Sequence, residues 1–145
     1  MRFSKKSEYA LRAVLILADR PPNQTLQIQE LSEISGVSVK FLEQILLAMK
    51  KDGILRSKRG VGGGYQLDRP PRSITLGEII LVMDGDLCDL NSSTKAHGTP
   101  EYPGSSGLQT CFAEIDEQIN QLLNNRTIEE ILSMDRPKDM LVFDI

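Results

Sequence analysis

The chain is constrained most by two helical patterns that are separated by a single glycine and followed at once by a glycine-rich segment. The first pattern covers residues 28–35, with the inward side chains Ile28, Leu31 and Ile34. Gly36 follows it, as a residue in a left-handed helix C-cap would. Ser38 can cap the second helix, which we expect to run to about residue 52 with a buried stripe of Leu42, Ile45, Leu46 and Met49.

A β-hairpin pattern comes directly after these helices. Residues 54–57 and 65–67 favour strands, and the segment Lys58–Gly64 between them is rich in glycine. This segment does not match a phosphate-binding P-loop, because no Lys-Ser or Lys-Thr pair follows its glycines. The order helix, turn, helix, hairpin predicts a winged helix-turn-helix fold, mainly α with a small β-hairpin wing.

Further helices are expected on both sides of this unit. Ser4 can cap a first helix that ends before Pro21, and Thr75 can cap another, with Glu78 at the capping-box position. Between Asp84 and about Thr110 the polar and glycine-rich sequence cannot build a core, so we expect a functional or disordered loop. A long helix should then run from about Cys111 to Asn124, and Thr127 should cap a short last one.

These patterns divide the chain into three regions. Residues 1–83 form the winged helix-turn-helix domain, residues 84–110 the loop, and residues 111–145 a long C-terminal helix with its following segment. The long helix carries an apolar stripe that has too little left in its own chain to pack on, so we expect it to be a dimerisation helix through Phe112, Ile115, Ile119 and Leu122.

Charge is distributed unevenly along the sequence. Residues 1–72 hold 13 Lys and Arg against 7 Asp and Glu, whereas residues 73–145 hold 4 against 13. A basic front half suggests binding to a polyanion. The chain has no membrane-spanning apolar run and no signal-peptide pattern, and its two distant cysteines make no disulfide framework. We therefore expect a cytoplasmic protein with no membrane partner.

The winged helix-turn-helix arrangement predicts contacts with double-stranded DNA. A helix beginning at Ser38 fits the major groove, where Glu43 can accept from cytosine and Gln44 can pair with adenine. Lys50, at the far end of that helix, would lie nearer phosphate, and wing cations can approach phosphate or a narrow minor groove. The candidate DNA-binding residues are Ser38, Lys40, Phe41, Glu43, Gln44, Lys50, Arg56, Lys58, Arg59, Gly60, Gly62, Gly63 and Tyr65.

Four segments carry a resemblance to a known family: Ser7–Arg12, Phe41–Gln44, Arg59–Tyr65 and Thr75–Ile79. Together they resemble the IscR/NsrR/CymR family of bacterial winged-helix transcription regulators, over nearly the whole chain. The resemblance implies a symmetric homodimer whose long C-terminal helices cross, with one wing and one recognition helix on each half of a palindromic operator. It implies a regulator of transcription, which we expect to be a repressor, and not an enzyme.

Many members of that family hold an iron–sulfur cluster through three grouped cysteines in the loop before the long helix. This sequence has only Cys88 and Cys111, and Glu114 stands where a ligand histidine can sit. In some members the first helix of the partner supplies an acid. The resulting hypothesis is a 2Fe-2S cluster bound by Cys88, Cys111, the partner's Glu8 and His97.

Other interpretations remain open at this point. Both cysteines can be inert core thiols, Glu8 can be an ordinary first-turn acid, and His97 can be an exposed loop residue. A regulator of the same fold without a cluster would respond to a protein partner or to cysteine oxidation. Two further classes are a small enzyme using Cys111 or His97, for which no orienting acid is visible, and a module whose wing binds acidic proteins.

Overall fold

The structure, a computed structural model, describes residues 3–90 and 101–135. Its helices are α1 (Lys5–Ala18), α2 (Ile28–Ser35), α3 (Val39–Lys51), α4 (Leu76–Asp84), α6 (Ser105–Asn125) and α7 (Ile128–Met134). Strands β1 (Leu55–Lys58) and β2 (Gly64–Leu67) form the antiparallel hairpin, and a short 3-10 turn, η1 (Pro71–Ser73), follows. The predicted fold, mainly helical with a small hairpin and a long C-terminal helix, is confirmed.

The predicted helix boundaries rest on caps that the structure contains. Four hydroxyl side chains each accept a hydrogen bond from the backbone N–H three residues later, which satisfies one otherwise unpaired donor at each helix start. These caps are Ser4, Ser38, Thr75 and Thr127. Thr75 and Glu78 form the complete capping box, and Gly36 ends α2 in the left-handed conformation with φ 74°.

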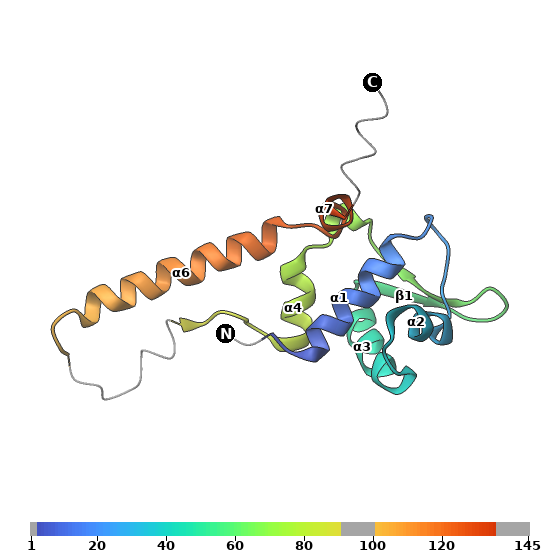
Figure 1. Cartoon of the computed structure of the whole chain (residues 1–145), viewed down its shortest axis with the longest axis horizontal. Coiled ribbons are helices and arrows are strands. Elements are labelled where there is room, and N and C mark those ends of the chain that lie inside the picture. The colour runs from blue at the N-terminus through green and yellow to red at the C-terminus, as the bar shows by residue number, and fades with distance from the viewer. Residues whose placement is uncertain (1–2, 91–100, 136–145) are drawn as a thin grey trace, which may run out of the picture.

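The core lies where α1 packs against α2, α3, α4 and the hairpin (Figure 1). Its fully buried side chains are almost all aliphatic, at about 1.5–3 kcal/mol of favourable transfer free energy for each large one. The largest are Leu31, Leu42, Ile45, Leu46, Met49, Ile54, Leu55, Ile74, Ile79 and Ile128. Because Ile128 begins α7, that last helix closes the core and anchors the C-terminal end of α6 to the body.

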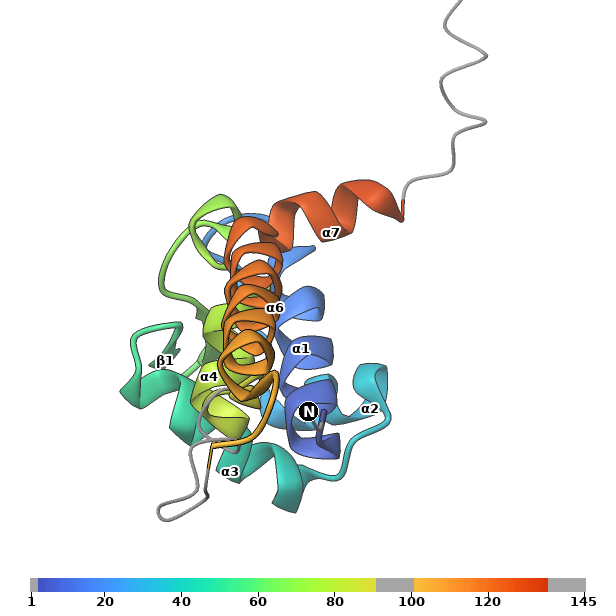
Figure 2. The ribbon, with the colours of Figure 1, turned by 90° about the vertical axis from the view of Figure 1, so that its left-hand side faces the viewer.

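Helix α6 is the exception to this packing. It leaves the body on the side away from the hairpin and extends as an arm, and none of its residues is buried (Figure 1). Seen from its free end, α6 is viewed nearly along its axis, in front of α4 (Figure 2). Within its own chain, α6 packs mainly against α4 and the segment that follows α4.

Two expectations need correction. The long helix begins at Ser105, not near Cys111, so the predicted loop to residue 110 is too long at that end. Small polar residues and glycine hid the first turn, because they lower helix propensity and carry no apolar periodicity. Ile34 is 50% exposed instead of inward, because α2 buries only Leu31 and Ser35.

Candidate nucleic-acid interface

Helix α3 has one buried face and one open face. Ser38 caps it by accepting a hydrogen bond from the Phe41 N–H at 3.3 Å. The four predicted stripe residues are fully buried and fix the helix to the body. The opposite face exposes the predicted polar side chains Lys40, Glu43, Gln44 and Lys50. A helix held in this way offers donors and acceptors to a groove without leaving the core.

One residue of that open face, Leu47, is not among the residues predicted from the sequence. Leu47 is 52% exposed, and it follows Glu43 and Gln44 at helical spacing. Its position in the outward stripe could have been read from that spacing, but a leucine in an apolar helix is assigned to the core by default. An exposed leucine on this face can contact a thymine methyl group.

Phe41 has a different environment from its polar neighbours. Its ring meets the edge of Tyr9 with centroids 5.3 Å apart and an interplanar angle of 86°. The Arg12 guanidinium stacks over Tyr9 at 5.2 Å and donates to the Ser35 carbonyl at 2.7 Å. These contacts connect α1 to both helices of the helix-turn-helix. Phe41 therefore fixes the start of α3 by packing against Tyr9 of α1.

The exposed cations and the glycines of the hairpin lie toward its turn, at the end away from the body of the protein. Leu55 pairs with Leu67 at the base and Lys58 with Gly64 at the top, so the turn lies beyond Lys58. Arg56, Lys58 and Arg59 are all exposed. Gly60 and Gly62 adopt left-handed φ values of 89° and 75°, which only glycine takes without strain.

The α1–α2 connection supports the wing from one side. Leu26 and Tyr65 exchange two backbone hydrogen bonds of 2.8 and 3.0 Å. These bonds form an isolated antiparallel bridge between the α1–α2 connection and strand β2. A Cβ at Gly64 would collide with the Leu26 carbonyl, and one at Gly63 would lie 2.8 Å from the Gly60 carbonyl. The absence of a side chain at these glycines therefore allows the wing to pack closely against Leu26. Tyr65, which pairs with Leu26, is half-buried.

The two cysteines are in contrasting environments. Cys88 is 4% exposed and its thiol donates to Asp116 Oδ1 at 3.0 Å, and the same oxygen accepts from the Leu90 N–H at 3.0 Å. Cys111 is exposed on α6. The hydrogen bond to Asp116 and burial both raise the pKa of the Cys88 thiol, so Cys88 is held protonated. Asp116 lies 28 residues away in the sequence, and no sequence signal pointed to it.

The proposed cluster ligands are not assembled within one chain. Glu8 is engaged on α1, where it pairs with Lys5 at 2.9 Å and with Arg12 at 3.0 Å. His97 lies outside the described residues. Among residues 3–90 and 101–135, no three His, Cys, Asp or Glu side chains gather closely enough to hold a metal ion. Within the described residues of one chain, Glu8 and Cys88 are thus engaged with other side chains, and a complete set of cluster ligands is not assembled.

A second hydrogen-bonded carboxylate lies where α4 ends. Asp84 accepts from the Ser4 N–H at 3.2 Å, from the Ser4 hydroxyl at 2.5 Å and from the Ser7 hydroxyl at 2.5 Å. Partial burial opposes ionisation, but these hydrogen bonds outweigh it, so the pKa of Asp84 lies below its ordinary value. The segment leading to Cys88 therefore starts from a fixed point on α1.

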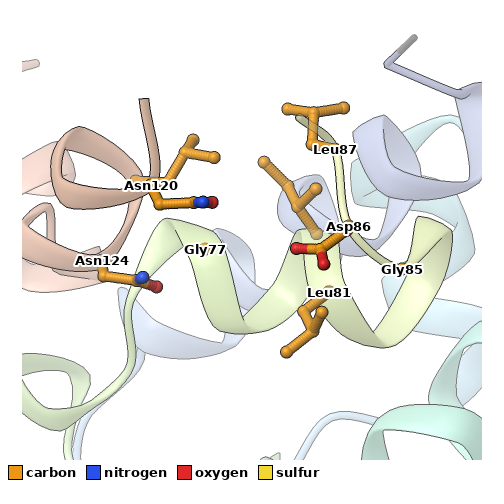
Figure 3. A pocket seen from close by; sticks show the side chains of 9 residues that line it. Gly77, Leu81, Gly85, Asp86, Leu87, Asn120 and Asn124 are labelled. Atoms are coloured by element: carbon orange, nitrogen blue, oxygen red, sulfur yellow. The ribbon is translucent and has the colours of Figure 1, made fainter. Parts of the chain in front are cut away.

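Helices α4 and α6 approach each other around a small cavity (Figure 3). Asn120 and Asn124 of α6 line it together with Gly77 of α4 and with Asp86 and Leu87. A Cβ at Gly77 would collide with the Asn124 side chain. The face of α6 that meets its own chain is thus partly polar, with Asn120, Leu123 and Asn124, and the predicted stripe lies on another face.

That stripe is largely open to solvent. Ile115 is 42% exposed and Leu122 is 70% exposed, while Phe112 and Ile119 are half-buried. Leu108, 40% exposed, extends the stripe toward the start of the helix.

No described helix is long and apolar enough to cross a membrane.

Comparison with known proteins agrees with this architecture. The Rrf2 family, described as an iron-dependent transcriptional regulator, matches residues 3–134. The rrf2-like HTH-type transcriptional regulator of Rhodobacter capsulatus is 32% identical over 97% of this chain and 99% of its own. The HTH-type transcriptional regulator IscR of Vibrio parahaemolyticus is 30% identical over 92% of this chain and 78% of its own.

Solved structures share the fold along nearly the whole chain. The global cysteine regulator CymR of B. subtilis has a TM-score of 0.80 at 24% identity, covering 94% of this chain and 99% of its own. IscR of T. potens has a TM-score of 0.74 at 26% identity, covering 94% and 89%. These relatives are regulators and not enzymes, as the sequence led us to expect. The chain is a winged-helix transcription regulator and belongs to the Rrf2 family.

Proposed function

We propose that this regulator binds a palindromic operator in double-stranded DNA as a homodimer and represses the adjacent genes. The observation that carries the proposal is the outward face of α3, where Lys40, Glu43 and Gln44 are exposed on a helix whose opposite side is fully buried. The exposed cations of the wing, Lys58 and Arg59, would grip the sugar–phosphate backbone. Together they supply both base readout and backbone positioning.

The open apolar stripe of α6 supports the homodimer. Leu108, Ile115 and Leu122 are 40–70% exposed, although each would gain free energy by burial. A second copy packed along α6 would cover them. A two-fold dimer would then present its recognition helices about one DNA turn apart, ~34 Å, which is the spacing that a palindromic site requires.

DNA binding is tested by comparing an operator fragment with a random duplex of equal length. Fluorescence anisotropy should show tighter binding to the operator and a steep loss of affinity with salt. Arg59→Ala should weaken binding to both duplexes and reduce the salt slope by about one unit. Glu43→Ala should instead lower the preference for one base step by ~1–3 kcal/mol. Equal affinity of the unaltered chain for the two duplexes would refute specific recognition.

We propose that the signal acts on the segment between α4 and α6. This segment begins at Asp84, which is tied to α1, and its Cys88 is tied to Asp116 of α6. A change at Cys88 would release Asp116 of α6 from the segment that follows α4, and through the dimer it would alter the relative angle of the two recognition helices. The chemical form of the signal is either a 2Fe-2S cluster or the oxidation of a thiol.

The hydrogen bond between Cys88 and Asp116 favours the thiol form in the single chain, whereas a cluster would require ligands brought by dimerisation, such as the partner's Glu8. Iron and acid-labile sulfide analysis of protein kept from oxygen separates the two. Stoichiometric iron and sulfide, lost in Cys88→Ala, would support the cluster. Colourless protein without sulfide, whose DNA affinity changes on treatment with peroxide, would support thiol oxidation.

A further inference from the structure

A cavity of about 430 Å³ lies between the segment that follows α1 and the base of the hairpin. Residues 20–24 form one wall, and Gln66–Arg72 together with Arg56 form the other. The volume lies within the range of small-molecule sites, roughly 300–1,000 Å³. Neither the outward face of α3 nor the wing tip at residues 60–63 contributes to its lining.

The lining is strongly cationic. It holds four arginines, Arg20, Arg56, Arg69 and Arg72, against one carboxylate, Asp68. Two of these arginines are engaged with protein groups. Arg69 forms a two-point ion pair with Glu78 at 3.0 and 3.2 Å, and Arg56 lies 4.0 Å from Asp68 and donates to Asn23 at 3.5 Å.

The other two arginines supply uncompensated charge. Within residues 3–90 and 101–135, no ion pair joins Arg20 or Arg72 to a carboxylate. Arg20 is half-buried, which makes an unpaired guanidinium there costlier than one free in solvent. The N–H groups of a guanidinium match the geometry of a carboxylate or phosphate group. Arg20 and Arg72 therefore indicate that the ligand is an anion.

The remaining lining residues make a rigid and partly apolar frame. Four prolines, Pro21, Pro22, Pro70 and Pro71, restrict the backbone on both walls. Asn23 is the one non-glycine residue in the described part of the chain with a left-handed backbone, φ 68°, and its side chain accepts the hydrogen bond from Arg56. Leu17 and Leu67 supply apolar surface. A site of this kind is formed before its ligand arrives.

We propose that this cavity binds a small organic anion, with its carboxylate or phosphate group held by Arg20 and Arg72. The non-polar part of the ligand lies against Leu67 and the prolines. Because Arg56 belongs to β1 and Gln66 to β2, the bound ligand also fixes the base of the wing to the segment after α1. The ligand thereby changes the DNA affinity of the chain from a site that is separate from Cys88.

The test measures ligand binding without DNA, so its result does not depend on the proposed operator. The probes are inorganic pyrophosphate and citrate, each titrated into ¹⁵N-labelled protein, with sodium chloride at matched ionic strength as the reference. We expect saturable amide shifts at Asn23, Gln66 and Arg72 with at least one probe, and the better probe identifies phosphate or carboxylate as the preferred group.

The variant Arg20→Ala/Arg72→Ala should weaken that binding at least about tenfold. Lys6→Ala removes an exposed cation from the other end of α1 and should leave probe binding unchanged. Shifts that sodium chloride reproduces, or that persist in the double variant, would overturn the proposal.

A random duplex distinguishes the cavity from a contact with the DNA backbone. We expect the duplex to shift amides of α3 and of the wing tip while pyrophosphate or citrate still binds the cavity. If the duplex instead displaced the probe, and if the double variant lost duplex affinity to the same extent, the arginines would be DNA contacts and the small-anion site would be refuted. The DNA affinity of the double variant, measured without probe, should equal that of the unaltered chain.

Discussion

Two carboxylates, Asp84 and Asp116, hold the beginning of the segment between α4 and α6. Asp84 receives three hydrogen bonds from Ser4 and Ser7, and Asp116 receives the Cys88 thiol and the Leu90 N–H. Ser7 is fully buried, so its hydroxyl depends on Asp84. The side chains of Asp84 and Asp116 thus connect the helix-turn-helix body to α6, the helix that carries the exposed apolar stripe.

Asp84→Ala should lower the free energy of unfolding by ~1–3 kcal/mol at pH 7, because it leaves the buried Ser7 hydroxyl without its acceptor. The pKa of Asp84 is lowered in the folded chain, so its ionised form stabilises the fold above the ordinary carboxyl pKa of about 3.9. That stabilisation is lost as the pH falls through the lower folded value.

Urea unfolding at pH 7 and at pH 3 measures both effects. The difference in stability between the unaltered chain and Asp84→Ala should shrink at pH 3. Glu129→Ala, which removes an exposed carboxylate from α7, should leave the stability at pH 7 within about 0.5 kcal/mol. An equal loss for Asp84→Ala at both pH values would contradict the titration.

Cys88 should become more reactive when its acceptor loses its charge. In a Cys111→Ser background, Asp116→Asn removes the carboxylate that raises the pKa of the Cys88 thiol, so the thiolate fraction at pH 8 increases. Iodoacetamide should then label Cys88 several times faster. Glu117→Gln changes a neighbouring exposed carboxylate on α6 and serves as the control. If Asp116→Asn and Glu117→Gln labelled at the same rate, the thiol would not be governed by Asp116.

At the level of helices and strands, the sequence predicted what local chemistry determines. Caps such as Ser38 and Thr75, and the left-handed Gly36, act within one turn, so their residue types reveal them. The same holds for the glycine-tipped hairpin. The apolar stripe likewise predicted the long C-terminal helix, but not its first turns from Ser105, which carry no apolar signal.

Contacts between distant segments could not be predicted in this way. The bridge between Leu26 and Tyr65 and the bond between Cys88 and Asp116 join residues that are 39 and 28 positions apart. Neither pair has a residue type or a spacing that singles it out. The cationic cavity at the wing base likewise depends on the folded approach of two loops, since its arginines are scattered from residue 20 to residue 72.

The close approach of α4 and α6 depends on Gly77. Gly77→Ala would place a Cβ 3.2 Å from the backbone of Leu123, in addition to its collision with Asn124, so the Asn124 side chain must move and the contact with α6 tightens. We expect a loss of ~1–3 kcal/mol in the free energy of unfolding, as for other overpacked contacts. Gly107→Ala, on the free part of α6, meets nothing within 4 Å and should instead raise stability by up to about 1 kcal/mol. Chemical denaturation compares the two, and a neutral Gly77→Ala would mean that α6 is not held in this position.

In the complete chain, the exposed apolar stripe of α6 favours self-association, because a second copy would bury it. The part of α6 that meets α4 carries Asn120 and Asn124, while Leu122, on the stripe, is 70% exposed. A single chain would thus have an apolar arm in water, and the wing of that chain would reach only half of a palindrome. DNA affinity and self-association are therefore expected to be lost together.

Leu122→Arg tests this coupling, because a guanidinium placed in an apolar interface must be desolvated without a partner. Sedimentation at micromolar concentration should change from dimer to monomer, and affinity for the palindrome should fall to that for a single half-site. Gln121→Arg adds the same charge one position earlier, at an exposed residue on a different face of α6, and should remain a dimer with unchanged DNA affinity. A Leu122→Arg chain that stayed dimeric would place the assembly surface elsewhere. A monomer that still bound the palindrome as tightly as the unaltered chain would show that recognition does not need two wings.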